Sequence, residues 1–118
     1  FEGYANGEWG AIGGGGGGDT QTVTTTSTTQ TTLATYAKAT YVGAEIVVVA
    51  DDGTDRTIAK LLVVHDGTTA VATQFGEVNT STQLATYDVD ISGTDVRLRV
   101  TAASSTSTDH TAIATLIE

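Results

Sequence analysis

The sequence predicts an all-β protein: an antiparallel β-sandwich or jelly-roll-like domain of about seven strands. Thr, a β-branched residue that favours a pleated surface, occurs 25 times among the 118 residues. Short apolar-rich runs are separated by turn-forming Gly, Asp and Ser, which is typical of strands joined by tight connections. No stretch shows a helical period of useful length. A closed barrel is the architecture that these observations leave as an alternative.

The chain divides into three parts. Residues 1–18 set a few bulky side chains among glycines and end in six consecutive glycines, which predicts an N-terminal anchor and a Gly hinge, or glycines packed at a symmetry axis. Residues 19–32 are nearly all hydroxyl and amide and predict either a hydrated linker or an edge or stalk strand that orders against another subunit. Residues 33–118 are the predicted sandwich. Because Phe1 stands where an initiating Met would be, we expect a processed product or a fragment.

Seven runs within residues 33–118 have the composition of strands. They are Thr35–Tyr41, Ala44–Ala50, Arg56–His65, Thr69–Phe75, Leu84–Ile91, Asp95–Ala102 and Thr111–Ile117. The second run is apolar on both faces, which predicts a central strand, and the fifth and sixth alternate apolar with polar residues, which predicts one inward face. Asp66-Gly67 lies between two of the runs and predicts a tight hairpin, because such turns need positive φ angles.

Charge and composition exclude several classes of function. The net charge of −9 argues against nucleic-acid binding and against adhesion to an anionic membrane, since both need basic surfaces. No apolar run approaches the ~20 residues that span a bilayer. The absence of Cys excludes a disulfide framework and thiolate chemistry.

Few residues suggest site chemistry. His65 and His110 are each next to an Asp and are expected to be surface or strand-end histidines, because nothing marks a partner nucleophile or a third metal ligand. The cluster Asp51, Asp52 and Asp55 is expected to be a solvated turn, with a weak cation site as the alternative.

Carboxylates elsewhere could in principle pair for glycoside hydrolysis, with Asp88, Asp90 and Glu77 as the candidates. Alternation on the strand explains Asp88 and Asp90 more simply, as a solvent-facing side. Arg97 and Arg99 share the outward side of the next strand, and we expect them to pair with these cross-strand carboxylates or with another subunit. We therefore predict no catalytic, cofactor or metal site, and a protein that is not an enzyme.

Several segments carry a resemblance to a known family. They are KLLVVHDGT at 60–68, VATQFGEV at 71–78, LATYDVDISG at 84–93 followed by VRL at 96–98, and EWGAIGGG at 8–15. From Tyr41 to Ile117 the chain resembles a β domain found near the C-terminus of structural proteins of tailed bacteriophages, including phages of marine cyanobacteria. The resemblance implies a virion component of fibre or surface-decoration type on the particle's outer surface, commonly a homotrimer, without catalytic residues.

Together these features predict a structural virion protein. The aromatic and aliphatic side chains of the N-terminal segment would dock on a neighbouring virion protein, because buried aromatics dominate interface energetics. The predicted interface residues are Phe1, Tyr4, Trp9, Ile12, Arg97 and Arg99.

Two alternatives remain. One is a glycan- or receptor-binding tip module, for which a host surface glycan would be the partner and an exposed aromatic platform would be needed. The candidates for that platform are Trp9, Tyr36, Tyr41 and Phe75. The other is a subunit of a bacterial extracellular fibre, in which the Thr-rich segment would be donated to a neighbour by strand exchange.

Overall fold

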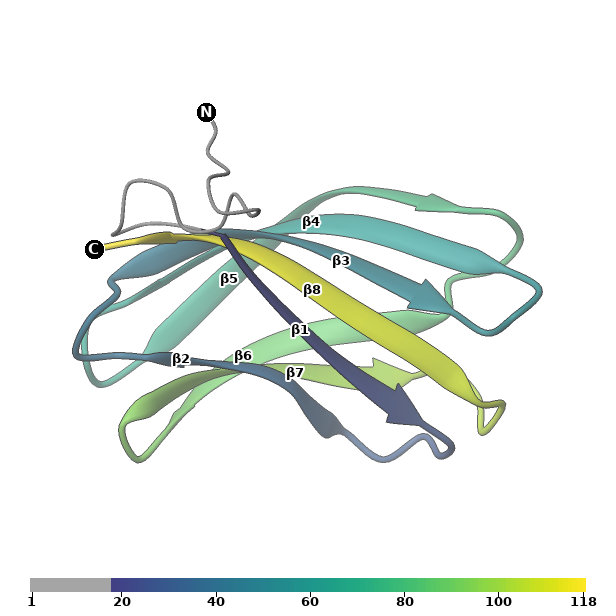
Figure 1. Cartoon of the computed structure of the whole chain (residues 1–118), viewed down its shortest axis with the longest axis horizontal. Coiled ribbons are helices and arrows are strands. Elements are labelled where there is room, and N and C mark those ends of the chain that lie inside the picture. Colours follow the sequence, from purple (N-terminus) through teal and green to yellow (C-terminus); the bar gives the residue numbers. More distant parts are fainter. Residues whose placement is uncertain (1–17) are drawn as a thin grey trace, which may run out of the picture.

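The computed structural model describes residues 18–118, and within them every regular element is a β-strand (Figure 1). The eight strands are β1 Gly18–Thr25, β2 Thr31–Ala37, β3 Gly43–Asp51, β4 Arg56–His65, β5 Ala70–Asn79, β6 Ala85–Ser92, β7 Asp95–Ala102 and β8 Thr108–Ile117. No helix in this part of the chain is long and apolar enough to cross a membrane.

The strands form two sheets that pack face to face. The five-stranded sheet has the order β1-β8-β3-β4-β5 and the three-stranded sheet the order β2-β7-β6, which occupies the lower part of the view in Figure 1. Every pairing is antiparallel. The predicted antiparallel sandwich is therefore confirmed. β3, which the sequence predicts to be a central strand, lies at the centre of the five-stranded sheet.

The additional strand comes from the Thr-rich segment. β1 is the edge strand of the five-stranded sheet, and it pairs with β8 of the same chain along its whole length, from Gly18 opposite Thr115 to Thr25 opposite Thr108. Most of its side chains are hydroxyl or amide, and Val23 is its one apolar side chain that packs against the core, so the strand forms mainly by joining the ladder of β8.

The first predicted strand is wrong in its bounds. The sequence predicts Thr35–Tyr41, whereas β2 begins at Thr31 and ends at Ala37. After Ala37 the chain turns, and the N–H groups of Thr40 and Tyr41 both donate to the Ala37 carbonyl at 3.2 and 3.0 Å. The alternation of apolar and polar residues that predicted the strand therefore extends past its end at Ala37 into the turn.

The Asp66-Gly67 hairpin forms as the sequence predicts. Gly67 has a φ of 92°, which favours glycine, and the Asp66 Oδ1 accepts from the N–H groups of Thr68 and Thr69 at 2.9 and 2.8 Å. These hydrogen bonds lower the pKa of Asp66, and the one from Thr69 contributes most. The turn joins β4 to β5 and fixes their register.

The core lies between the sheets and consists mainly of small and medium apolar side chains. The centres of both sheets contribute completely buried residues, among them Ile46 and Val48 from β3 and Leu98 and Val100 from β7. The buried Thr57 hydroxyl is paired on both sides: it donates to Asn79 Oδ1 at 2.6 Å and accepts from the N–H of Leu84 at 3.0 Å. This pairing holds the β5–β6 connection to β4.

One side-chain amide closes the rim where β1 of one sheet meets β2 of the other. Gln21 Nε2 donates to the carbonyl of Thr35 at 2.9 Å, and the N–H of Thr35 donates to Gln21 Oε1 at 3.0 Å. The amide thus makes the two hydrogen bonds that a further strand would make to Thr35.

Candidate interaction surface

The exposed apolar side chains of the described residues are concentrated on one surface. Eight large ones lie on the side of the five-stranded sheet that points away from the core, and none lies on the three-stranded sheet. We call this surface the apolar face. Its eight exposed residues are Ile58, Leu62, Val64, Val71, Phe75, Val78, Ile113 and Ile117.

The strand register arranges these residues in rows across the sheet. From β8 to β5 the rows are Ile117–Gly43–Val64–Val71, Thr115–Glu45–Leu62–Thr73, Ile113–Val47–Lys60 with Phe75 beside them, and Thr111–Val49–Ile58–Val78. The side chains that β1 contributes to this side of the sheet are small. They are Thr20, Thr22 and Thr24. The apolar face therefore has a hydroxyl-rich border along β1.

The apolar face is hollowed in two places. A groove of about 580 Å³ is lined by Leu62, Val64, Val71 and Ile117 among others. A second, of about 320 Å³, lies further along β4 and β5 beside Ile58, Phe75 and Val78. β5 is bulged between them, where Gly76 has a φ of 92°, so the strand bends at this point.

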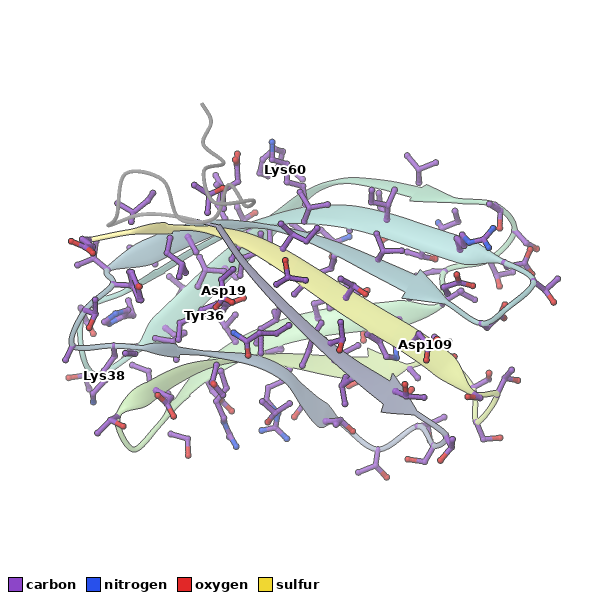
Figure 2. The ribbon with its side chains drawn as sticks, viewed as in Figure 1. Asp19, Tyr36, Lys38, Lys60 and Asp109 are labelled. Carbon is purple, nitrogen blue, oxygen red and sulfur yellow. The ribbon has the colours of Figure 1, made fainter. Side chains whose placement is uncertain are left out.

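Charge on the apolar face is balanced. Lys60 Nζ lies 3.0 Å from Glu45 Oε2 and 5.5 Å from the centre of the Phe75 ring. Figure 2 shows Lys60 extending away from the three-stranded sheet. At the end of the sheet, Arg56 Nε lies 3.0 Å from Asp51 Oδ2. A chain with a net charge of −9 thus carries an apolar face whose central charges cancel.

The outer side of the three-stranded sheet is polar. Arg97 donates to both oxygens of Asp90 at 2.7 and 2.8 Å, and Arg99 Nη1 lies 3.4 Å from Asp90 Oδ2. The hydrogen bonds from Arg97 are the main reason that the pKa of Asp90 is lowered. The predicted cross-strand pairing is found at Asp90 but not at Asp88, whose Oδ1 accepts from the N–H of Val89.

The predicted interface residues lie in two places. Arg97 and Arg99 are on this polar outer side, in β7. Phe1, Tyr4, Trp9 and Ile12 lie outside the described residues. The sequence prediction did not include the apolar face, although the two-sided apolar pattern of β3 and β4 was its signal.

The acidic cluster forms a turn between β3 and β4. Asp51 Oδ1 accepts from the N–H of Gly53 at 2.8 Å, and Asp52 Oδ1 accepts from those of Thr54 and Asp55 at 2.9 and 2.7 Å. These backbone hydrogen bonds lower the pKa of both Asp51 and Asp52. Among residues 18–118, no three His, Asp or Glu side chains converge as a metal site would require.

The two histidines differ in environment. His65 ends β4, as predicted, where its Nδ1 accepts from the N–H of Gly67 at 2.9 Å and its Nε2 lies 2.5 Å from the Tyr41 carbonyl. The prediction of a surface or strand-end residue is wrong for His110, which is completely buried in β8 with its Nε2 2.9 Å from the Thr25 hydroxyl. Burial lowers the pKa of His110.

The remaining candidates do not form a joint site. Glu77 is held by three side-chain amides, those of Gln74, Asn79 and Gln83, at 2.7 to 2.9 Å. Of the predicted aromatic platform, Tyr36 is buried, Tyr41 is partly buried against the core, Phe75 is 44% exposed, and Trp9 lies outside the described residues. Burial raises the pKa of Tyr36, and that of Tyr87 to about 12.

Comparison with known proteins identifies where this fold occurs. The tailspike protein of Acinetobacter phage vB_ApiP_P1 matches 80% of this chain with a TM-score of 0.56 and 16% sequence identity. The tailspike protein of Acinetobacter baumannii phage AM24 matches 82% of it with a TM-score of 0.50 and 9% identity. The chain covers only 20% and 26% of those two proteins. No family model and no curated protein sequence matches it. The fold is therefore one that phage tailspike proteins contain.

Proposed function

We propose that this chain is a structural β-sandwich unit of a bacteriophage virion protein of tailspike or tail-fibre type, exposed on the particle and assembled as a homotrimer. The fold similarity to two phage tailspike proteins carries this proposal, and it agrees with the resemblance of the 60–98 segments to phage structural proteins. The finer assignment to proteins of marine cyanophages rests on that resemblance alone.

The contacts of the polar groups favour a role without catalysis. Asp90 is bound by two arginines, Glu77 by three amides, and Asp51 and Asp52 by turn N–H groups. A general acid or base has to exchange a proton with substrate, and these carboxylates are engaged in structure instead. We propose on this ground that the chain is not an enzyme.

The same reasoning ranks the alternatives. A glycan-binding platform would rely on Phe75 and Tyr41 within the described residues, but Lys60 already lies over the Phe75 ring and Tyr41 is packed against the core. A donor-strand fibre would need the Thr-rich segment to be free, but β1 is paired with β8 of its own chain. Structural assembly is the function that both observations favour.

Immunogold electron microscopy with an antibody against residues 18–118 tests this proposal. We expect label at the tail of virions that contain the chain. Regular label over the head would contradict the tail assignment and favour a decoration protein. Label on cell-surface filaments, with none on virions, would overturn the virion role. Virions carrying Trp9→Ala test the N-terminal anchor separately, because we expect them to lose the protein, whereas Thr86→Ala virions should keep it.

A further inference from the structure

We infer that the apolar face is the surface through which copies of this chain associate. The inference deepens the assembly role and rests on the proposed function. It starts from the concentration of all the exposed large apolar side chains of three strands, β4, β5 and β8, on one side of one sheet. The largest contiguous apolar patch on a typical soluble monomer covers ~300–600 Å² and is often functional.

The size of the apolar face fits a protein partner. Four strands about 4.8 Å apart, with about eight residues each, span roughly 500 Å² in projection. A stable interface buries about 800 Å² on each partner, with an apolar centre and a polar rim. The threonines of β1 and the Asp51–Arg56 pair at the end of the sheet provide such a rim.

Charge allows another copy to be the partner. Two chains of net charge −9 repel each other, so they can approach closely only where the local charge is balanced. On the apolar face Glu45 and Lys60 neutralise each other at 3.0 Å. On the three-stranded sheet Arg97 and Arg99 both pair with Asp90, and among residues 18–118 the neighbouring Asp88 has no cationic partner within 4.0 Å.

The shape of the apolar face also fits a copy of itself. A partner has to supply apolar side chains to fill the two grooves, one on either side of the Glu45–Lys60 pair. Within residues 18–118 the exposed large apolar side chains all lie on the apolar face except Val42, which lines the larger groove beside it. Two sheets that pack face to face through such side chains form a layer like the interior of a sandwich.

Association of the 118-residue chain in solution provides the first test. We expect sedimentation velocity to show an oligomer that Leu62→Glu dissociates, with a dissociation constant at least about tenfold higher, because the carboxylate would be buried between apolar side chains. Thr86→Glu places the same charge on exposed β6 of the three-stranded sheet and should leave the oligomer intact. Circular dichroism confirms that each variant is folded.

Three results would overturn the inference: a wild-type chain that is monomeric at all concentrations, a folded Leu62→Glu variant that associates normally, or equal loss of association with Thr86→Glu. A monomeric wild-type chain that associates only when residues 1–12 are deleted would show that its own N-terminal segment covers the apolar face, which also overturns it. A trimer would support both the inference and the proposed homotrimer. A dimer would support the surface and contradict the trimer.

A second measurement keeps the inference testable without a disruptive substitution. The sequence has no Cys, so Thr73→Cys and Thr86→Cys each give one labelling site. Thr73 is exposed beside Leu62 on the apolar face, and Thr86 is exposed on β6. Spin labels at Thr73→Cys should give short distances between subunits and those at Thr86→Cys long ones, and the reverse order would overturn the inference. Tail label in the microscopy of virions would still hold if this surface failed.

Discussion

The outer sides of the two sheets are built from the same kind of strand, but they differ in what their side chains can contact. On the three-stranded sheet, Arg97 and Arg99 of β7 both pair with Asp90 of β6. On the five-stranded sheet, alternate residues of β4, β5 and β8 are large and apolar. The difference shows that a strand which is apolar on both sides marks either a covered centre or a surface kept for a partner.

The largest expected effect on stability comes from comparing a leucine of the core with a leucine of the apolar face. Leu98→Ala in β7 removes a side chain that is 1% exposed and should lower the free energy of unfolding by ~2–5 kcal/mol at any protein concentration. Leu62→Ala on the apolar face removes one that is 46% exposed. Its effect should appear only at concentrations where copies associate. Urea unfolding at low and high protein concentration measures both, and a large concentration-independent loss for Leu62→Ala would contradict the distinction.

The next effect concerns β8, which has Ile113 on the apolar face and His110 in the core. Because burial lowers the pKa of His110, the unfolded chain binds the proton more tightly than the folded one. Stability is therefore complete above the ordinary His pKa of about 6.5 and falls below it, by at most ~1.4 kcal/mol per pH unit, until the folded protein also takes up the proton.

Urea unfolding between about pH 5 and pH 7.5 measures this slope, in a range where ordinary carboxylates stay ionised. His110→Gln should flatten it. His65→Gln is the matched control, because His65 lies at a strand end. An unchanged slope in His110→Gln would show that burial of this ring is not its origin.

A smaller effect separates the ion pairs of the two outer sides. Arg97→Ala removes two short hydrogen bonds to Asp90 and should lower the free energy of unfolding by the larger amount. Lys60→Ala removes two exposed contacts, with Glu45 and with the Phe75 ring, and should lower the free energy of unfolding by less. Both are measured by urea unfolding at a protein concentration too low for association, and a larger loss for Lys60→Ala would reverse the order.

The smallest effect is the titration of one carboxyl on the polar side. Asp90 has a lowered pKa, so its pairing stabilises the fold above the ordinary Asp pKa of about 3.9 and is lost as the pH falls toward the pKa of the folded state. NMR of the Asp90 carboxyl should therefore give a midpoint below that value. Arg97→Ala should raise this midpoint. An unchanged midpoint would show that a group other than Arg97 lowers the pKa of Asp90.

Much of the fold follows from local sequence. β4 and β7 have the predicted bounds, because turn-forming or polar residues such as Asp66-Gly67 follow each of them. β1 could not be predicted as a strand of this sheet from composition alone, because most of its side chains are hydroxyl or amide and it is held by pairing with β8.

The candidate site was less predictable. The pairing of Arg97 with Asp90 follows from alternation on neighbouring strands. The apolar face does not, because the two-sided apolar pattern of Ala44–Ala50 indicates burial on both sides, and only the layer order shows that one side is left open. The buried position of His110 likewise depends on which strands lie opposite it.

The Gln21 amide at the rim between β1 and β2 has a consequence for the size of any assembly. A sheet grows without limit when its edge offers free N–H and C=O groups to the next chain. At Thr35 those groups are already taken by Gln21, and β5, at the far edge of the other sheet, is bent by the bulge at Gly76. Association through a face uses up the surface that drives it, so particles built from this chain should be finite and soluble, not ribbons.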